Sequence, residues 1–122
     1  MFELSVERTF CAAHAISIGG RREPVHGHNW RVSVTVAGET LDSDGLLCDF
    51  HVIERVLDGV IEPMHNADLN RVQPFTSVNP TAEQVARHIA AAIAPGLPGH
   101  AALRSVSVAE APGCVATYRP GA

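Results

Sequence analysis

Apolar and polar residues alternate in two stretches of the chain, and this alternation is the feature that most restricts its fold. A period of two residues is typical of a strand with one buried face. We expect the two stretches to be strands and to pair with each other. The segment 18–24 between them is polar, with two glycines and a proline, and predicts a surface loop. The alternating apolar residues are Phe2, Leu4 and Val6, then Trp30, Val32, Val34 and Val36.

Two later segments repeat apolar residues at helical spacing. The first follows Asp49, which stands where a side chain can cap a helix, and it ends near Pro63. The second begins at Thr81, which forms a capping-box pattern with Gln84, and it stops at Pro95. The apolar positions are Phe50, Ile53, Leu57, Val60 and Ile61 in the first helix and Val85, Ile89 and Ile93 in the second.

The C-terminal part predicts a hairpin, with strands near 103–108 and 114–118 joined by Ala111-Pro112-Gly113. The order is then ββααββ. Strands grouped around two helices predict an α+β fold with a four-stranded antiparallel sheet, whose helices cover one face. The other face needs a partner, so we expect oligomerisation. The length of 122 residues predicts a single domain, residues 1–122.

The composition argues against several classes of protein. Hydrophobic residues make up 46% of the chain, yet no stretch reaches the roughly 20 apolar residues of a membrane span, so we expect a soluble core and no membrane partner. The first residues lack the basic head and apolar block of a signal peptide, which predicts a cytoplasmic protein. A net charge of −4, with Arg21-Arg22 as the main basic pair, argues against nucleic acid. Three widely spaced cysteines predict free thiols.

Three histidines are the chemically informative residues. His26 and His28 lie two apart at the start of a predicted strand, so their side chains project from the same face. His14, at the end of an extension of the first strand, supplies a third imidazole. Three imidazoles can hold Zn²⁺ and leave the fourth position open to water or substrate, which is the catalytic arrangement. The alternative is that His-Gly-His merely begins a strand, and the motif alone is weak evidence for a metal.

The residues around these histidines resemble a known family. Phe10 to His14, followed by His26-Gly27-His28-Asn29-Trp30, is similar to the Phe-x-Ala-Ala-His and His-Gly-His-Asn-aromatic motifs of the 6-pyruvoyltetrahydropterin and 6-carboxytetrahydropterin synthases. The resemblance implies the tunnelling fold (T-fold), a homo-oligomer such as a trimer or hexamer with active sites between subunits, and a Zn²⁺-dependent lyase acting on a reduced pterin. Further blocks in family order are Leu47 to Phe50, Leu69-Asn70, Asn79 to Glu83 and Val108 to Pro112.

The resemblance assigns two carboxylates to the site. It implies that Glu110 binds the substrate, because a carboxylate can accept two parallel hydrogen bonds from a pterin ring N–H and amino group. The family's usual catalytic cysteine is replaced by Arg22. Glu23 begins a Glu-x-x-His-Gly-His pattern similar to a variant in which glutamate replaces that cysteine. Members of the variant are associated with converting dihydroneopterin triphosphate into 6-hydroxymethyl-dihydropterin. Without the resemblance, both carboxylates read as solvated charges.

The family's Asp-His pair reads Met64-His65 in this chain, so the resemblance makes His65 a catalytic candidate without its usual partner. Asp68 would lie on the same face of a helical turn, either replacing that partner or forming a surface pair. The expected function is a zinc-dependent enzyme acting on the side chain of a reduced pterin such as dihydroneopterin triphosphate, by carbon–carbon cleavage or elimination. The alternative is a family member that binds zinc and a pterin-like ligand without turnover.

Overall fold

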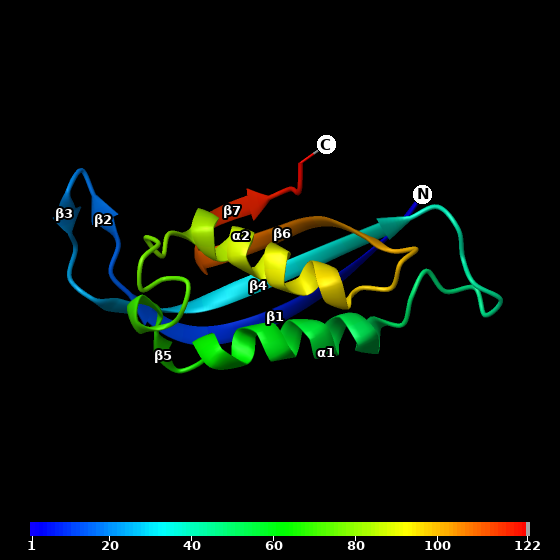
Figure 1. Ribbon diagram of the computed structural model, residues 1–122, viewed down its shortest axis with the longest axis horizontal. Coiled ribbons are helices and arrows are strands. Elements are labelled where there is room, and N and C mark those ends of the chain that lie inside the picture. Colours follow the sequence, from blue (N-terminus) through cyan, green and yellow to red (C-terminus); the bar gives the residue numbers. More distant parts are fainter. Residues whose placement is uncertain (122) are drawn as a thin grey trace.

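Two long antiparallel strands form the centre of the fold in the computed structural model, which describes residues 1–121. They are β1 (Phe2–His14) and β4 (His26–Gly38), and their register pairs Phe2 with Gly38 and His14 with His26. β6 (Ala102–Ala111) pairs with β4, and β7 (Cys114–Tyr118) pairs with β6, both antiparallel. Figure 1 shows β1 and β4 running side by side along the length of the molecule.

Two short elements differ from the fold expected from the sequence. β5 (Ala67–Asp68) pairs in parallel with β1, so the sheet has five strands in the order β5-β1-β4-β6-β7 rather than four antiparallel strands. The predicted surface loop 18–24 contains a small hairpin of β2 (Ser17–Ile18) and β3 (Arg21–Arg22). Two consecutive glycines with φ of 59° and 81° form its turn, because this backbone conformation matches the twist of a two-residue hairpin.

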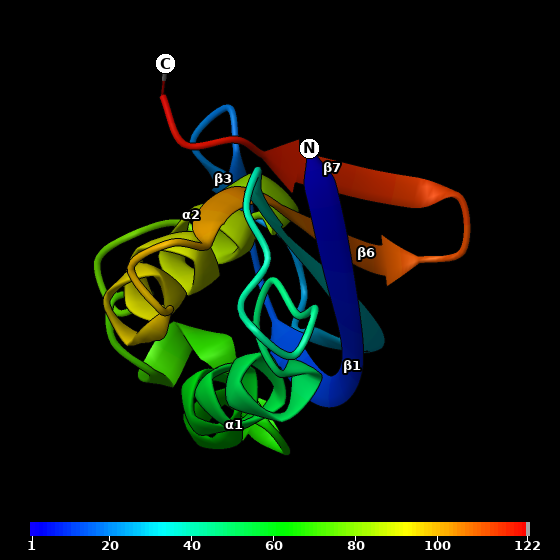
Figure 2. The same ribbon diagram turned by 90° about the vertical axis from the view of Figure 1, so that its right-hand side faces the viewer.

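Both helices cover the same face of the sheet, as Figure 2 shows. They are α1 (Phe50–Ile61) and α2 (Ala82–Ile93), and the predicted N-caps are confirmed. The Asp49 side chain accepts a hydrogen bond from the backbone of His51, and the Thr81 hydroxyl accepts one from the backbone of Gln84. Short 3-10 turns η1 (Glu62–Met64), η2 (Leu69–Arg71) and η3 (Ala94–Gly96) follow the helices or connect them.

The core lies between the helices and the sheet. Even-numbered residues of β4 from Trp30 to Val36 are fully buried and pack with Ile53, Leu57, Ile89 and Ile93. Phe50 begins α1 as the helical spacing predicts, but it is 50% exposed. Leu47, which comes just before the helix, is buried instead at 2% exposure and belongs to the core cluster.

In the part of the chain that the structure describes, the other face of the sheet carries no helix. Its exposed odd-numbered positions are largely small or polar, with hydrogen bonds between the hydroxyls of Ser5 and Thr35 (2.9 Å) and of Ser107 and Thr117 (2.8 Å). The three cysteines are free thiols, as predicted. Among residues 1–121, no helix is long and apolar enough to span a bilayer.

Candidate metal centre

Three imidazoles meet where the β1–β4 ladder ends. His14 lies directly opposite His26, and His28 follows two residues later on the same face of β4. One nitrogen from each ring lies within 4.8 Å of the other two. His14 is buried, with 1% of its surface exposed, whereas the His26 side chain is 40% exposed and His28 is half-buried. The pairing register therefore assembles the three predicted ligands into one cluster.

Backbone carbonyls orient two of these rings. His14 Nδ1 lies 2.8 Å from the carbonyl oxygen of Pro80, and His26 Nδ1 lies 3.0 Å from that of Pro24. A carbonyl oxygen only accepts, so each Nδ1 carries the proton and each Nε2 has a free lone pair. The Nε2 atoms of His14 and His28 are buried without a hydrogen-bond partner. A buried polar atom without a partner costs free energy, and a metal ion would satisfy both nitrogens.

The electrostatics favour a neutral ring at His28. Burial lowers the pKa of His28 below its ordinary value, because desolvation penalises the charged ring. The negative charge of Glu110 opposes this shift, and the nearby rings of His14 and His26 add to it. A neutral imidazole is the form that ligates a metal. The burial of His28 thus keeps its lone pair available to lower pH than in a solvated histidine.

Two carboxylates flank the histidine cluster. Glu23 Oε1 lies 3.6 Å from His26 Nε2, and the same oxygen accepts a hydrogen bond from the backbone of Ile16 (3.1 Å). On the other side, Glu110 Oε2 lies 3.8 Å from His14 Nε2. Glu23 comes from the segment before β4, and Glu110 comes from the end of β6, where the β6–β7 register shifts. Both predicted carboxylates therefore lie beside the predicted ligands.

His65 lies away from the histidine cluster, beside Cys11 of β1. Its Nδ1 accepts a hydrogen bond from the backbone N–H of Cys11 (3.2 Å), so its proton is on Nε2. Cys11 is three strand residues before His14, a separation of about 10 Å along β1. The side chain of Asp68 accepts from the backbone of Asn70 (3.1 Å), and within residues 1–121 no hydrogen bond or ion pair joins it to His65. The replacement of the family's aspartate by Asp68, which the sequence left open, is therefore not seen within this chain.

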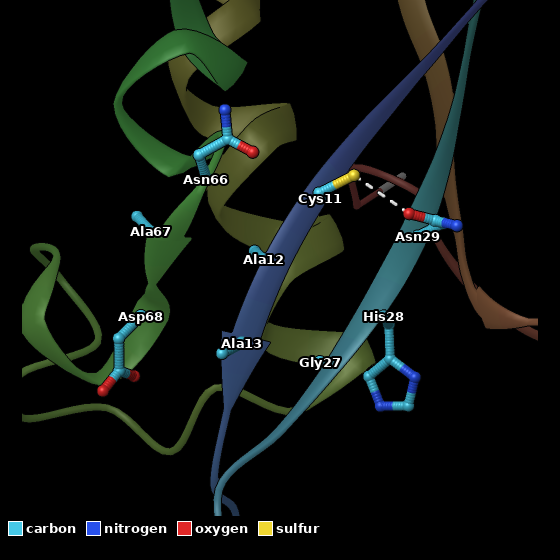
Figure 3. Close-up of a pocket in the computed structure, with 9 residues that line it drawn as sticks. All are labelled: Cys11, Ala12, Ala13, Gly27, His28, Asn29, Asn66, Ala67 and Asp68. Atoms are coloured by element: carbon cyan, nitrogen blue, oxygen red, sulfur yellow. Dashed lines mark hydrogen bonds between the residues drawn. The ribbon is translucent and has the colours of Figure 1, made fainter.

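Two cavities open beside the histidine cluster, and Gly27, His28 and Asn29 line both. The first, of about 540 Å³, extends from β4 to the β5 side of β1. Figure 3 shows the Cys11 thiol in it, directed at Asn29 Oδ1, to which it donates a hydrogen bond at 2.9 Å. The second, of about 650 Å³, contains Glu110. Both volumes suit a small organic ligand.

The carbonyl of Pro80 is a contributor that the sequence did not reveal. A backbone oxygen has no residue-type signature, and Pro80 is 66 residues from His14. The available signal was indirect: Pro80 belongs to the block Asn79 to Glu83 that precedes α2. Its position at the entry of a capped helix fixes the direction of the carbonyl.

Comparison with known proteins gives one family. A family model described as 6-pyruvoyl tetrahydropterin synthase matches residues 3–121. The dihydroneopterin monophosphate aldolase of Pyrococcus furiosus is 35% identical over 84% of this chain and 83% of its own length. The 6-carboxy-5,6,7,8-tetrahydropterin synthase of Bacillus subtilis is 33% identical over 98% of this chain and 86% of its own length.

Solved structures share the fold. The 6-pyruvoyl tetrahydropterin synthase of Caenorhabditis elegans superimposes with a TM-score of 0.84 at 22% identity, covering 99% of this chain and 98% of that one. The Plasmodium vivax 6-pyruvoyltetrahydropterin synthase, solved with a catalytic glutamate replaced by alanine, gives 0.82 at 20% identity over the same shares. The likeness confirms the expected α+β tunnelling fold.

Proposed function

Because the chain belongs to the 6-pyruvoyl tetrahydropterin synthase family, we propose that it is a zinc-dependent enzyme acting on the side chain of a reduced pterin such as dihydroneopterin triphosphate. One observation carries the proposal. Three imidazole nitrogens converge, and two of them are buried without a partner. The substrate class is proposed from its relatives, which include enzymes named for reactions of pterins.

The donor set fits zinc. His14, His26 and His28 would be the three protein ligands, and three imidazoles leave the fourth position for a substrate atom. When bound, the metal supplies Lewis acidity that lowers the pKa of a coordinated hydroxyl. The hydrogen bonds from His14 to Pro80 and from His26 to Pro24 hold the rings in the tautomer that such binding needs.

Glu23 is the proposed proton acceptor. Its carboxylate lies 3.6 Å from His26 Nε2, close enough to reach a hydroxyl bound beside the ligands. In carbon–carbon cleavage, the bond between the first and second side-chain carbons breaks. The hydroxyl proton of the second carbon passes to Glu23 and that carbon becomes a carbonyl, while the electron pair of the broken bond stays with the first carbon, attached to the pterin, which then takes the proton back from Glu23. The aldolase relative supports cleavage over elimination, and the catalytic glutamate of the Plasmodium vivax enzyme is a parallel for Glu23.

Glu110 is the proposed anchor for the pterin ring. It lines the larger cavity together with His28, so a ring held by its carboxylate would extend its side chain towards the histidines. A carboxylate pairs with two adjacent N–H donors through two parallel hydrogen bonds. Glu110 would therefore set the orientation of the substrate, and Glu23 would act on its side chain.

His65 would serve the site of a neighbouring copy in a homo-oligomer such as a trimer or hexamer. It lies at the outer edge of β1, of which β5 covers only Ala12 and Ala13. The uncovered length of β1 offers backbone groups to another chain. With the single ring proton on Nε2, His65 would donate a hydrogen bond to the substrate across that boundary.

The alternative is a protein that binds zinc and a pterin-like ligand without turnover. Arg22 stands at the family's cysteine position and Met64 at its aspartate position, which favours this reading. Both functions use the histidine cluster to bind zinc, but only the enzyme needs Glu23 as a proton acceptor.

The decisive experiment measures the metal content of the purified protein and then analyses products formed from dihydroneopterin triphosphate by chromatography. We expect one zinc per chain and a 6-hydroxymethylpterin product, and Glu23→Ala should lower its rate by about 100-fold or more. Glu39→Ala, at an exposed carboxylate in another loop, is the control. Absence of zinc would refute the proposal, and bound zinc without any product would favour the binding protein.

A further inference from the structure

The segment that links His14 to the β2–β3 hairpin is held by asparagine side chains. Asn70 Oδ1 accepts a hydrogen bond from the backbone N–H of Ala15 (2.8 Å), and Asn70 Nδ2 donates to the carbonyl of the same residue (2.9 Å). Asn79 does the same for Ser17, with both distances 2.9 Å. Each amide therefore bonds both backbone groups of one residue, as a neighbouring strand would.

Glu23 holds the residue between these two. Its carboxylate accepts from the N–H of Ile16 (3.1 Å), and its backbone N–H donates to the carbonyl of Ile16 (3.0 Å). The backbone groups of Ala15, Ile16 and Ser17 are thus bonded alternately on the two sides of the segment. This alternation is the pattern of a strand in the middle of a sheet.

The pattern continues the outer edge of β1. The N–H of Cys11 donates to His65, its carbonyl accepts from Asn66 (2.6 Å), and Ala13 pairs with β5. Two and four residues further on, β5 has ended, and the asparagine side chains occupy the positions that its backbone would have filled. Their segment, residues 70–79, therefore extends the sheet edge past the last backbone strand.

The consequence concerns the distance between Glu23 and the histidines. Ile16 is bonded to Glu23 and lies two residues after His14, so the position of this segment determines where the carboxylate lies relative to the cluster. Asn79 also precedes Pro80, whose carbonyl holds the His14 ring. The dipeptide Asn79-Pro80 therefore hydrogen-bonds both to the candidate metal ligand His14 and to the segment 15–17, in which Ile16 binds the Glu23 carboxylate.

We propose that Asn70 and Asn79 are positioning residues that act as a substitute edge strand, locking residues 15–17 so that the Glu23 carboxylate stays beside the histidine cluster. The inference rests on the proposed function for its catalytic consequence. Its structural part concerns Ile16 alone: the hydrogen bonds between Ile16 and Glu23 depend on asparagine side chains whose own hydrogen bonds go to Ala15 and Ser17.

The test measures amide hydrogen exchange by NMR, with and without zinc, in Asn70→Leu and Asn79→Leu. We expect exchange at Ile16 to accelerate about tenfold in both variants, although the hydrogen bonds of the asparagines go to Ala15 and Ser17, because the lost bonds release the whole segment. Glu23→Ala should accelerate the same amide. Gln73→Leu removes an exposed side-chain amide from the same connection, and it should leave Ile16 protected.

Turnover provides the second readout. In the zinc-loaded protein, both leucine variants should lower kcat about tenfold with little change in KM, whereas Asn70→Asp and Asn79→Asp keep the acceptor and should retain more activity. Protection of Ile16 that persists while only Ala15 or Ser17 is exposed would overturn the inference. If the wild-type protein binds zinc but has no turnover, the proposed function fails, while exchange at Ile16 still decides the role of the asparagines.

Discussion

The Nδ1 proton of His14 is donated to the carbonyl oxygen of Pro80, 2.8 Å away, at the entry of α2. This bond leaves Nε2 of a 1%-exposed ring without a hydrogen-bond partner among residues 1–121. Burying this lone pair costs free energy unless a cation or a hydrogen-bond donor binds to it. The pairing therefore links the cap of α2 to the proposed metal.

Replacing a histidine of the cluster should abolish tight zinc binding. We expect His28→Ala to weaken the affinity for zinc by more than about 100-fold, because removing a direct ligand costs more than altering an outer-shell partner. His51→Ala, at an exposed histidine of α1 outside the cluster, should bind zinc as the wild type does. Competition with a chromophoric chelator measures both. Equal affinities in the two variants would exclude the cluster as the site.

The stability of the metal-free protein should fall as the pH drops below the ordinary histidine pKa of about 6.5, in part because of His88. Burial lowers the pKa of His88, whose ring packs against Phe75. The unfolded chain then binds a proton that the folded chain resists, so acid favours unfolding. Urea unfolding at pH 7 and pH 5 should show a smaller loss in His88→Gln. Equal losses in both proteins would contradict this assignment.

Two glycine substitutions should change stability in opposite directions. A Cβ at Gly38 would collide with the Leu47 side chain and lie 2.8 Å from the carbonyl of His100, so Gly38→Ala should cost about 1–3 kcal/mol. A Cβ at Gly59, within α1, would meet nothing within 4 Å. Gly59→Ala should therefore stabilise the helix by about 0.5–1 kcal/mol. Denaturant midpoints measure both, and a shared sign would refute the packing argument.

Assembly through the open edge of β1 should depend on the backbone N–H of Ser5. The N–H of Cys11 points away from β4, and in the regular β1–β4 register the N–H of Ser5 points the same way. Ser5→Pro would remove only this outward donor from the backbone, so it should shift the protein towards smaller species in sedimentation. Ser5→Ala, which loses the same hydroxyl contact with Thr35, should assemble normally. Identical sedimentation of the two variants would argue against this edge.

Local patterns in the sequence predicted most of the elements. The caps Asp49 and Thr81 and the spacing of Ile53, Leu57 and Ile61 act within one or two turns, so they predict helices without knowledge of the rest of the chain. The spacing did not show that Leu47 is buried while Phe50 is half exposed, because burial at the start of α1 depends on how the preceding loop is placed. The short strand β5 was missed because two residues carry no periodicity.

The candidate site divides in the same way. The sequence alone identified the three histidines as candidate ligands. His26 and His28 lie two residues apart on one strand and so share a face, and His14 ends the strand that was expected to pair with it. Only the tertiary structure decided that His65 lies against Cys11, and that Pro80, Asn70 and Asn79 hold His14 and the segment after it. These contacts join residues 54 to 66 positions apart. They depend on how the connection between α1 and α2 packs along the edge of β1, which no local pattern of residue types records.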